Sequence, residues 1–435
     1  MLNANHFRSH RIKLLDAMGA GVAVIPTARE KVRNRDSHYP YRYDSYFYYL
    51  TGFQEPEAVL VLIAGDTPKS VLFCREKDFE REIWDGFRYG PENAKTEFGF
   101  DEAYPISRLD ELVPQLIANH NRLYYTLGSS SEWDTRIAAW INHLKSQARN
   151  GIHAPEEIVD LYSRIDDLRL IKSEYEIDIM RRAANISAAA HRRAMLRAAP
   201  GVVEYELEAE LLHEFYRHGS RSPAYTSIVA GGANACVLHY IENNAQLKDG
   251  DLVLIDAGCE LEGYASDITR TFPVNGKFSA PQRDLYELVL NAQAAAIDKI
   301  KPGAHWNESH EAAVNVLVQG FIDLGLCKGS AASVLESGDY RRFYMHRTGH
   351  WLGLDVHDAG EYKQQDGSWR VLEPGMVMTV EPGCYVRPAD DVPEHFWNIG
   401  IRIEDDVLVA PQGYDILTSE APKSIADIEA LMVNA

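Results

Sequence analysis

The chain has 435 residues, with 44 basic and 64 acidic side chains and therefore a formal net charge of −20. This acidic balance argues against nucleic acid and against an anionic membrane as partners, because binding to either depends on a basic surface. At about 150 residues per domain the length predicts two or three domains, each large enough to bury a core.

The five cysteines are odd in number and scattered, without the paired spacing of a disulfide framework or a cysteine zinc site. The longest apolar run, residues 58–64, is far shorter than the ~20 residues that span a bilayer. The N-terminal stretch lacks the basic region, long apolar core and cleavage site of a signal peptide. We therefore expect a cytoplasmic enzyme.

The first part of the chain, to about residue 165, alternates short apolar runs with helical patterns. The runs GVAVIP, EAVLVLIAG, KSVLFC and RLYYTLG predict strands, and residues 107–118 and 134–148 predict helices. This alternation indicates an α/β domain with a mixed sheet. An aromatic cluster at residues 39–53 interrupts it, and its composition fits either internal packing or an interface.

The second part of the chain begins with a long helical pattern. The predicted helices are residues 166–199, 203–218, 281–301 and 307–324. They mix with strands and hairpins without regular alternation, which favours an α+β fold over a parallel barrel. We expect the domain boundary near residue 165, giving domains 1–165 and 166–435.

Residues 251–272 read as a β-hairpin with its turn at residues 260–263. A hairpin symmetric about Leu261 and Glu262 pairs Asp256 directly with Asp267, with Cβ atoms ~5 Å apart on one face. Two carboxylates this close repel each other unless a cation lies between them. The pair alone fits a metal site, or a turn or cap role for one of the two residues.

The segment HRTGHWLGLDVHD contains His346, His350 and His357. The spacing resembles a helical face, but the two glycines and the valine favour loop-to-strand geometry. A single histidine in such a segment is more often structural, whereas three within twelve positions favour a metal-ligand or acid–base role.

Two glutamates, Glu381 and Glu404, stand at or near the ends of apolar strands. Burying an unpaired carboxylate costs several kcal/mol, so an inward-facing glutamate implies an ion or an arginine nearby. Arg402 should share a strand face with Glu404. An ordinary salt bridge is at least as good an interpretation of Arg402 as substrate binding.

Together these positions supply four carboxylates and one imidazole: Asp256, Asp267, His350, Glu381 and Glu404. Four negative charges match two divalent cations, and oxygen-rich ligation favours Mn²⁺ or Co²⁺ over a structural Zn²⁺. Two metal ions ~3.5–4 Å apart acidify a shared water and polarise a carbonyl, which is hydrolase chemistry.

These residues resemble a known family. HRTGHWLGLDVHD is similar to the proline-peptidase signature, and the ligand set resembles that of the pita-bread metallopeptidases, which include methionine aminopeptidase, prolidase and Xaa-Pro aminopeptidase. RDSHYPYRYDSYFYYLTGFQEPEAVLVL and GYASDITRTFPVNGKFS resemble Xaa-Pro aminopeptidases in particular. The resemblance covers nearly the whole chain. It implies a pita-bread (creatinase/aminopeptidase-like) catalytic domain behind an N-terminal domain of the aminopeptidase P type.

The resemblance also implies individual roles. Asp256 would bind one metal ion, His350 and Glu381 the other, and Asp267 and Glu404 would bridge both. A bridging hydroxide would attack the bond before proline, with Glu381 as proton shuttle. The implied substrate contacts are His239 and His357 for the oxyanion, His346, Tyr225 and Arg402 for the proline pocket, and Asp36 for the substrate amino group.

Several expectations rest on the same resemblance. The metal ions are most readily Mn²⁺, with Co²⁺ or Zn²⁺ as alternatives, the partners are peptides with proline in the second position, and the chain is expected to form a dimer or tetramer. A proline dipeptidase with the same ligands is the nearest alternative. Metal-free creatinase should lack most of the ligands, and a non-enzymatic pita-bread module of the histone-chaperone kind should lose ligand carboxylates. Residues 361–372 and 387–397 match no pattern, and these loops are expected to control access to the site.

Overall fold

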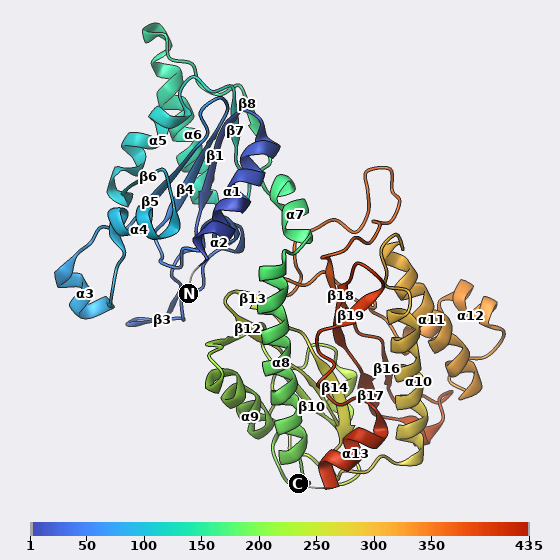
Figure 1. Ribbon diagram of the computed structural model, residues 1–435. Helices are drawn as coiled ribbons and strands as arrows, with labels where there is room; N and C mark the ends of the chain where they lie inside the picture. The colour runs from blue at the N-terminus through green and yellow to red at the C-terminus, as the bar shows by residue number, and fades with distance from the viewer. Residues whose placement is uncertain (1–2, 434–435) are drawn as a thin grey trace. The chain divides into compact units, whose positions relative to one another are not determined.

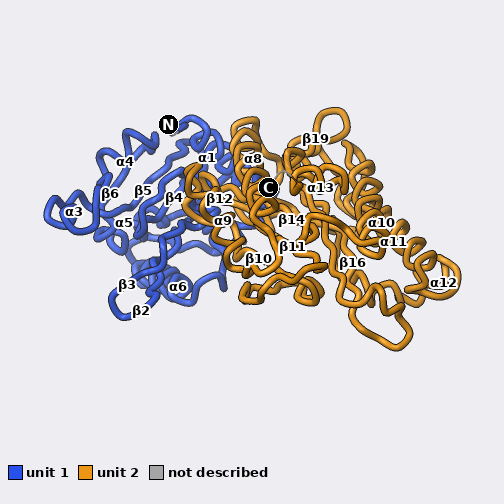
Figure 2. Tube along the Cα trace, turned by 90° about the horizontal axis from the view of Figure 1, so that it is seen from below, with its two compact units in different colours: residues 1–169 blue, residues 170–435 orange. Residues whose placement is uncertain are grey.

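The computed structural model describes residues 3–433, and the chain divides into two compact units, residues 1–169 and 170–435 (Figure 2). Among the described residues, no helix has both the length and the apolar character needed to cross a membrane.

The first unit is built on a six-stranded sheet in the order β6-β5-β4-β1-β7-β8 (Figure 1). Its strands are β1 (Gly21–Pro26), β4 (Val59–Ala64), β5 (Lys69–Cys74), β6 (Glu102–Pro105), β7 (Arg122–Tyr124) and β8 (Glu157–Val159). The pairs β1–β4 and β4–β5 are antiparallel, whereas β5–β6, β1–β7 and β7–β8 are parallel. The mixed sheet predicted from the sequence is therefore confirmed, with the apolar runs at β1, β4, β5 and β7.

Helices cover both faces of this sheet. They are α1 (Ala4–Met18), α2 (Ser45–Thr51), α3 (Phe79–Asp85), α4 (Gly90–Phe98), α5 (Leu109–Ile117) and α6 (Ser131–Ser146). The apolar sides of α5 and α6 pack on β1, β4 and β5, with Val113 and Trp140 in the shared core. A short hairpin of β2 (Val32–Asn34) and β3 (Ser37–His38) completes the unit.

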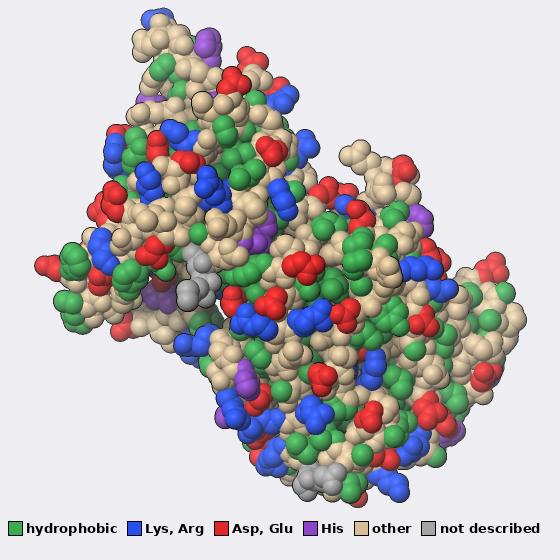
Figure 3. Space-filling view, in the orientation of Figure 1, with side chains coloured by type: hydrophobic (Ala, Val, Ile, Leu, Met, Phe, Trp, Pro, Cys, Tyr) green, Lys and Arg blue, Asp and Glu red, His purple; other side chains and the backbone are tan. Residues whose placement is uncertain are grey.

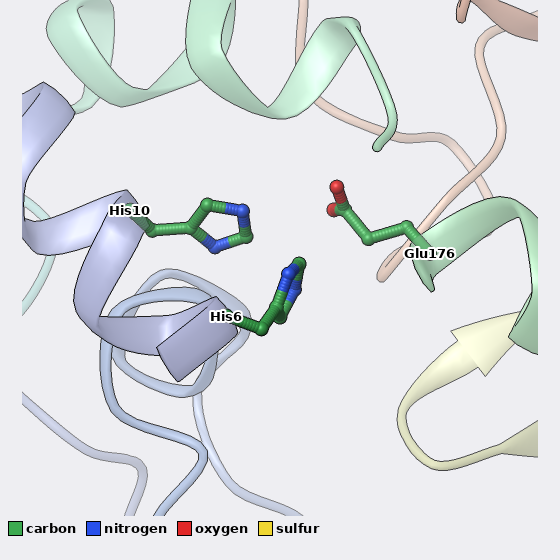
Figure 4. Close-up of side chains that lie close together, drawn as sticks. All are labelled: His6, His10 and Glu176. Atoms are coloured by element: carbon green, nitrogen blue, oxygen red, sulfur yellow. The ribbon is translucent and has the colours of Figure 1, made fainter. Parts of the chain in front are cut away.

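The aromatic cluster at residues 39–53 is mostly packing. It forms α2, in which Phe47, Tyr48 and Tyr49 are buried. His6 and His10, one turn apart on α1, project from the same side of that helix (Figure 4), and the ring of His10 stacks on Tyr49 at 3.9 Å. Internal packing, rather than an interface, therefore accounts for most of the aromatic side chains in this cluster.

A different segment of the first unit exposes apolar side chains. Helix α3 and the residues after it carry Phe79, Ile83, Trp84 and Phe87, which are between 61% and 85% exposed. The green atoms at the left of Figure 3 cover this helix. An apolar patch of this kind on a soluble surface commonly marks a contact with another chain.

The long helix predicted for residues 166–199 is two helices. Helix α7 (Tyr162–Leu170) ends, and α8 (Glu174–Arg197) begins after Ser173. Ser173 and Glu176 form a reciprocal capping box, in which each side chain accepts a hydrogen bond from the other residue's backbone N–H. Glu176 also accepts a hydrogen bond from the Tyr264 hydroxyl at 2.8 Å. This S-x-x-E motif is a helix start signal within the apparently continuous pattern.

The second unit places short antiparallel sheets between two helix pairs, α8 with α9 (Glu204–Arg217) and α10 (Ala280–Ile297) with α11 (Trp306–Asp323) (Figure 1). The three-stranded sheets are β10-β11-β14, β13-β12-β9 and β15-β18-β19, and β16 pairs with β17. Two further helices are α12 (Ala331–Ser337) and α13 (Ile425–Val433).

The strands of this unit are β9 (Ser222–Pro223), β10 (Ile228–Gly231), β11 (Leu252–Asp256), β12 (Cys259–Leu261), β13 (Tyr264–Ala265), β14 (Thr269–Pro273), β15 (Val377–Val380), β16 (Gly383–Val386), β17 (Ile399–Arg402), β18 (Asp405–Val409) and β19 (Tyr414–Ile416). All their pairings are antiparallel. Antiparallel sheets with helices outside them confirm the α+β class predicted for this half of the chain.

Candidate metal centre and active site

A cavity of about 1190 Å³ opens in the second unit. Its wall includes every site residue that the sequence predicts in this unit: Tyr225, His239, Asp256, Asp267, His346, His350, His357, Glu381, Arg402 and Glu404. Asp36, the remaining predicted residue, belongs to the first unit, where it is exposed in the turn between β2 and β3.

The hairpin of β11 to β14 exists, but its predicted register is wrong by two residues. Asp256 pairs with Thr269 rather than with Asp267, and the turn is Glu262–Gly263. Both turn residues have positive φ, 50° and 87°, as in the type I′ turn that matches strand twist. A shift of two residues keeps each side chain on its face, so Asp256 and Asp267 remain on the same side as diagonal neighbours.

Gly258 lies opposite Asp267 in this register. A Cβ at this glycine would lie 1.7 Å from the carbonyl oxygen of Ser266, so only glycine fits where the two strands approach so closely. The absence of a side chain here leaves the carboxylate of Asp267 facing the cavity.

The hydroxyl of Tyr225 joins the two aspartates. It lies 2.6 Å from Oδ1 of Asp256 and also contacts a carboxylate oxygen of Asp267. Because a hydroxyl has one proton, it can donate to only one of the two carboxylates at a time. The hydroxyl alone therefore cannot satisfy both carboxylates.

The other three ligand candidates converge on the same place. Oxygen atoms of Asp267 and Glu404 and a ring nitrogen of His350 all lie within 4.8 Å of one another. Nε2 of His350 lies 3.5 Å from Asp267 and 3.7 Å from Glu381. Nδ1 of the same ring donates to the carbonyl oxygen of Trp351 at 3.0 Å, which leaves Nε2 as the ligand atom.

Strand ends explain why the two glutamates face inward. Glu381 follows β15 directly, and Glu404 lies between β17 and β18. Glu404 accepts a hydrogen bond of 2.7 Å from the Thr269 hydroxyl. The placement at strand ends matches the sequence-based expectation for both residues.

The electrostatics show a surplus of buried negative charge. Burial raises the pKa of Glu404 well above its usual range, and Asp267 and Glu381 add to the rise. Burial also raises the pKa of Glu381 to about 7, against the opposing effect of His350 and Arg402. For His350, burial alone would lower the pKa, but Asp267 and Glu381 outweigh it and raise the value to about 9. The side chains by themselves therefore retain protons that bound cations would displace.

Arg402 is the one arginine or lysine whose side chain bonds a carboxylate of the cluster among the described residues. Its Nη2 donates to Asp256 at 2.6 Å, its Nη1 to the Tyr385 hydroxyl at 3.0 Å, and its Nε to Thr269 at 3.1 Å. It balances one of four carboxylates. The donor set thus fits two divalent cations, since three carboxylates and an imidazole remain without an equivalent partner.

Two further histidines of the cavity wall, His346 and His357, differ in their surroundings. Nδ1 of His346 donates to the carbonyl of Arg347 at 2.7 Å, and its Nε2 accepts from Tyr385 at 2.8 Å. Burial lowers the pKa of His346 to about 3 and also lowers that of His357. The ring of His357 lies 4.3 Å from that of His350. His346 and His357 are therefore neutral at pH 7.

Sequence reasoning missed part of the cavity wall. Trp306, Arg347, Tyr362 and Trp369 also line the cavity. Tyr362 and Trp369 come from the segment 361–372, which matched no pattern, and Trp306 begins α11. The sequence signal that could have identified them is the presence of aromatic and cationic side chains in otherwise polar segments.

Two family models match the chain. The model of metallopeptidase family M24 matches residues 178–411, more than half of the chain, and that of the aminopeptidase P N-terminal domain matches residues 7–124. They confirm the expected pita-bread catalytic domain and the type of the domain before it.

Individual relatives agree over the full length. The Xaa-Pro aminopeptidase of Haemophilus influenzae is 46% identical over 433 residues, covering 99% of this chain and 98% of the relative. The structure of Pseudomonas aeruginosa aminopeptidase PepP is 52% identical with a TM-score of 0.98, covering 100% of this chain and 98% of the other. A zinc-substituted Escherichia coli aminopeptidase P in complex with product is 45% identical, with a TM-score of 0.97 and coverage of 100% and 99%. The chain therefore belongs to the Xaa-Pro aminopeptidase branch of metallopeptidase family M24, and it is a metallo-exopeptidase.

Proposed function

We propose that this chain releases the N-terminal residue from peptides with proline in the second position, using two divalent metal ions. The observation that carries the proposal is the convergence of four carboxylates and one imidazole on one cavity, with a single arginine to balance them. Four carboxylates, Arg402, two divalent cations and one hydroxide sum to zero charge, so the complete site is neutral.

The ligand assignment is the one that the family resemblance implies, and the convergence of Asp267, His350 and Glu404 supports it. Asp256 would hold one ion, His350 and Glu381 the other, and Asp267 and Glu404 would serve both. When bound, the two ions would supply a hydroxide at neutral pH and would polarise the carbonyl of the bond before proline. We favour Mn²⁺, with Co²⁺ or Zn²⁺ as alternatives, because oxygen ligands dominate the set. The zinc-substituted E. coli relative supports tolerance for Zn²⁺.

The side chains of this chain would position the substrate and move the proton. Glu381, with its pKa raised by burial to about 7 before metal binds, can take a proton and pass it to the leaving imino nitrogen. His239 and His357 line the cavity and would contact the oxyanion. Because His357 has a lowered pKa, its neutral ring contributes one N–H donor.

The proline pocket would be formed by His346, Tyr225 and Arg402, all on the cavity wall. The Tyr225 hydroxyl is directed to Asp256 and Asp267, so this residue would also orient the two aspartates. Since a bond before proline lacks an N–H, an enzyme that recognises the ring gains selectivity where other peptidases lose a hydrogen bond. Asp36, exposed in the first unit, keeps its proposed role near the substrate amino group.

Three wider proposals complete this function. The chain would form a dimer or tetramer, and the exposed apolar side chains of α3 supply a surface for it. A cytoplasmic location is supported by five buried cysteines, all of them in the thiol form. Nucleic acid and membranes are not expected partners because of the acidic charge balance.

The test uses metal-stripped protein to which Mn²⁺ is returned. The expected result is two bound ions per chain and metal-dependent release of the first residue from an Xaa-Pro-Yaa tripeptide, faster than from the Xaa-Pro dipeptide. Activity on the dipeptide alone would make the chain a proline dipeptidase. Failure to cleave either peptide with two ions bound would contradict the proposed substrate class, and failure to bind metal would contradict the ligand assignment.

A further inference from the structure

The cavity wall carries a second arginine that the proposed reaction does not use. Arg347 follows His346 directly, lines the cavity, and is exposed at its rim, whereas Asp267 and Glu404 are buried. Among the described residues it makes no ion pair with a carboxylate. Arg402, the other arginine on this wall, is bonded to Asp256.

Neutral contacts hold Arg347 in place. Its guanidinium carbon lies 5.2 Å from the centre of the Trp369 ring, and its Nη2 donates to the side-chain oxygen of Asn307 in the first turn of α11. Trp369 is itself fixed by a backbone bridge with Lys363. Stacking and one amide oxygen occupy part of the guanidinium and leave further N–H donors for a ligand.

The wall beside Arg347 is aromatic and closely packed. The ring of Trp306 lies 4.7 Å from that of Tyr362 and 4.1 Å from that of the buried Trp351. Such a wall suits an extended peptide that leaves the ligand cluster toward solvent, at ~3.3–3.6 Å per residue. An N-terminal residue held at the buried carboxylates directs the other end of a short peptide toward the rim.

We propose that Arg347 binds a carboxylate of the substrate one or two residues beyond proline. The chain would then prefer short peptides that carry a carboxylate there, either at the C-terminus or on an acidic side chain. This inference rests on the proposed function, since it concerns the same substrate in the same cavity. An arginine with free donors, in a chain of charge −20, matches the one anionic group that every unmodified peptide has, its C-terminal carboxylate. An acidic side chain after proline offers the same chemistry.

The experiment compares kcat/KM on matched peptides with the Mn²⁺-loaded enzyme. Xaa-Pro-Gly is compared with its C-terminal amide, Xaa-Pro-Glu-amide with Xaa-Pro-Gln-amide, and the series is extended to four and five residues. We expect the charged member of at least one pair to be about tenfold better in the wild type, mainly through KM, as for one charge-assisted hydrogen bond at a partly exposed site. The peptide length at which the acid–amide ratio is largest gives the position of Arg347.

Two variants test whether Arg347 causes the difference in kcat/KM between the charged and the uncharged peptides. Arg347→Gln should bring the ratio of kcat/KM between the charged and the uncharged peptide to about 1, mainly by lowering kcat/KM for the charged one. Arg347→Lys should keep part of the ratio, because lysine retains the charge but lacks the planar guanidinium. Lys363→Gln is the matched control, because Lys363 also lies over Trp369, at 4.4 Å, but does not line the cavity. The wild-type ratio should also fall as salt is added.

The outcomes separate this inference from the proposed function. Equal cleavage of acids and amides by the wild type, or the same ratio in wild type and Arg347→Gln, would overturn the role of Arg347 while the peptidase activity stands. A difference in kcat/KM only between Xaa-Pro-Glu-amide and Xaa-Pro-Gln-amide would mean that Arg347 binds an acidic side chain of the substrate rather than its C-terminal carboxylate. Cleavage of no peptide would contradict the proposed function itself.

Discussion

Two carboxylates that follow each other in the chain, Glu404 and Asp405, are both buried and have opposite surroundings. Asp405 accepts from Arg270 at 2.7 Å, from Lys423 at 2.6 Å and from the Thr418 hydroxyl at 2.7 Å. Burial would raise the pKa of Asp405, but the two cations outweigh it, and the pKa is lowered. The pKa of Glu404 is raised well above its usual range by burial and by its carboxylate neighbours.

The difference separates a structural from a functional use of buried charge. Asp405 has cations supplied by this chain, so its charge stabilises the fold. Glu404 faces a cavity where carboxylates outnumber cations, so its charge destabilises the chain until ions from solution enter. Neighbouring positions on one strand region can therefore have opposite effects on stability, and substitutions at the two positions should reveal this.

The largest expected effect is the loss of activity when Glu404 is replaced. Glu404→Gln removes a proposed shared metal ligand and should reduce kcat/KM on an Xaa-Pro-Yaa peptide by at least ~10³-fold, about 4 kcal/mol. The metal-free variant should unfold at the same or higher urea concentration than the wild type, because the raised pKa of Glu404 costs the wild type folding free energy at pH 7 that glutamine does not lose. Glu420→Gln, an exposed position, is the control. A large loss of stability in metal-free Glu404→Gln would contradict the comparison.

Replacing Asp405 should give the opposite pattern. Asp405→Asn leaves the fully buried Arg270 and the nearby Lys423 without their carboxylate, which should cost about 3–5 kcal/mol of unfolding free energy. Urea unfolding of the metal-free protein measures this. The fraction that remains folded should bind as many metal ions per chain as the wild type, for which we propose two. If Asp405→Asn were as stable as the wild type, Asp405 would not stabilise the fold, and the proposed contrast with Glu404 would be wrong.

The sequence could predict the proposed metal ligands but not this distinction. The letters IEDD place three carboxylates together, and only the folded chain shows that Asp405 meets Arg270 of β14 while Glu404 faces the cavity. The hairpin was predicted, but its turn at Glu262–Gly263 lacks the usual asparagine or aspartate, so the register was misplaced by two. Ser173 was overlooked as a cap because the helical pattern on each side of it is continuous.

Other parts of the site depend on long-range packing, which leaves little local pattern. Arg347 lies within the signature that identified the histidines, yet its partners Asn307 and Trp369 are far from it in sequence. The residues of the cavity wall between 361 and 372 have no strand or helix periodicity to detect. The proposed ligand residues, in contrast, lie beside apolar strands or in a glycine-containing loop. They can be predicted because aspartate, glutamate and histidine are unusual at such positions.

A third way to bury a titratable group is to keep it neutral, and His191 on α8 does this. Its Nε2 donates to the carbonyl of Ala257 at 2.9 Å, and burial lowers its pKa from 6.5 to about 4. Between these values the unfolded chain binds a proton that the folded chain does not. Stability from this residue is therefore complete above pH 6.5 and lost as the pH falls toward 4, by up to about 3 kcal/mol.

Urea unfolding of metal-free wild type and His191→Gln across this pH range measures the effect. The glutamine does not titrate, so the stability advantage of the wild type over the variant should shrink as the pH is lowered from 7 to 4. A difference between the two proteins that is the same at both ends of the range would show that folding does not lower the pKa of His191.

The smallest effect concerns a buried carboxylate balanced by neutral donors alone. Glu204, at the start of α9, accepts hydrogen bonds of 2.8–3.0 Å from the backbone of Gly231 and Ala245, from Asn234 and from the Tyr240 hydroxyl. These bonds hold the loop that carries His239 into the cavity. Tyr240→Phe removes one of the four donors and should cost about 1 kcal/mol of unfolding free energy.

If the bond from Tyr240 positions His239, the same variant should also lower kcat, by about fivefold or less, as expected for a loss of up to ~1 kcal/mol. That loss in kcat should disappear when Tyr240→Phe is made in the His239→Ala background, whereas the loss in stability should remain. Tyr205→Phe, at an exposed tyrosine of α9, should change neither quantity. A kcat loss of the same size with and without His239 would mean that the loop acts through another residue. Neutral donors would then stabilise the fold here without orienting the histidine, in contrast to Arg402, the charged partner of Asp256, which holds a proposed ligand directly.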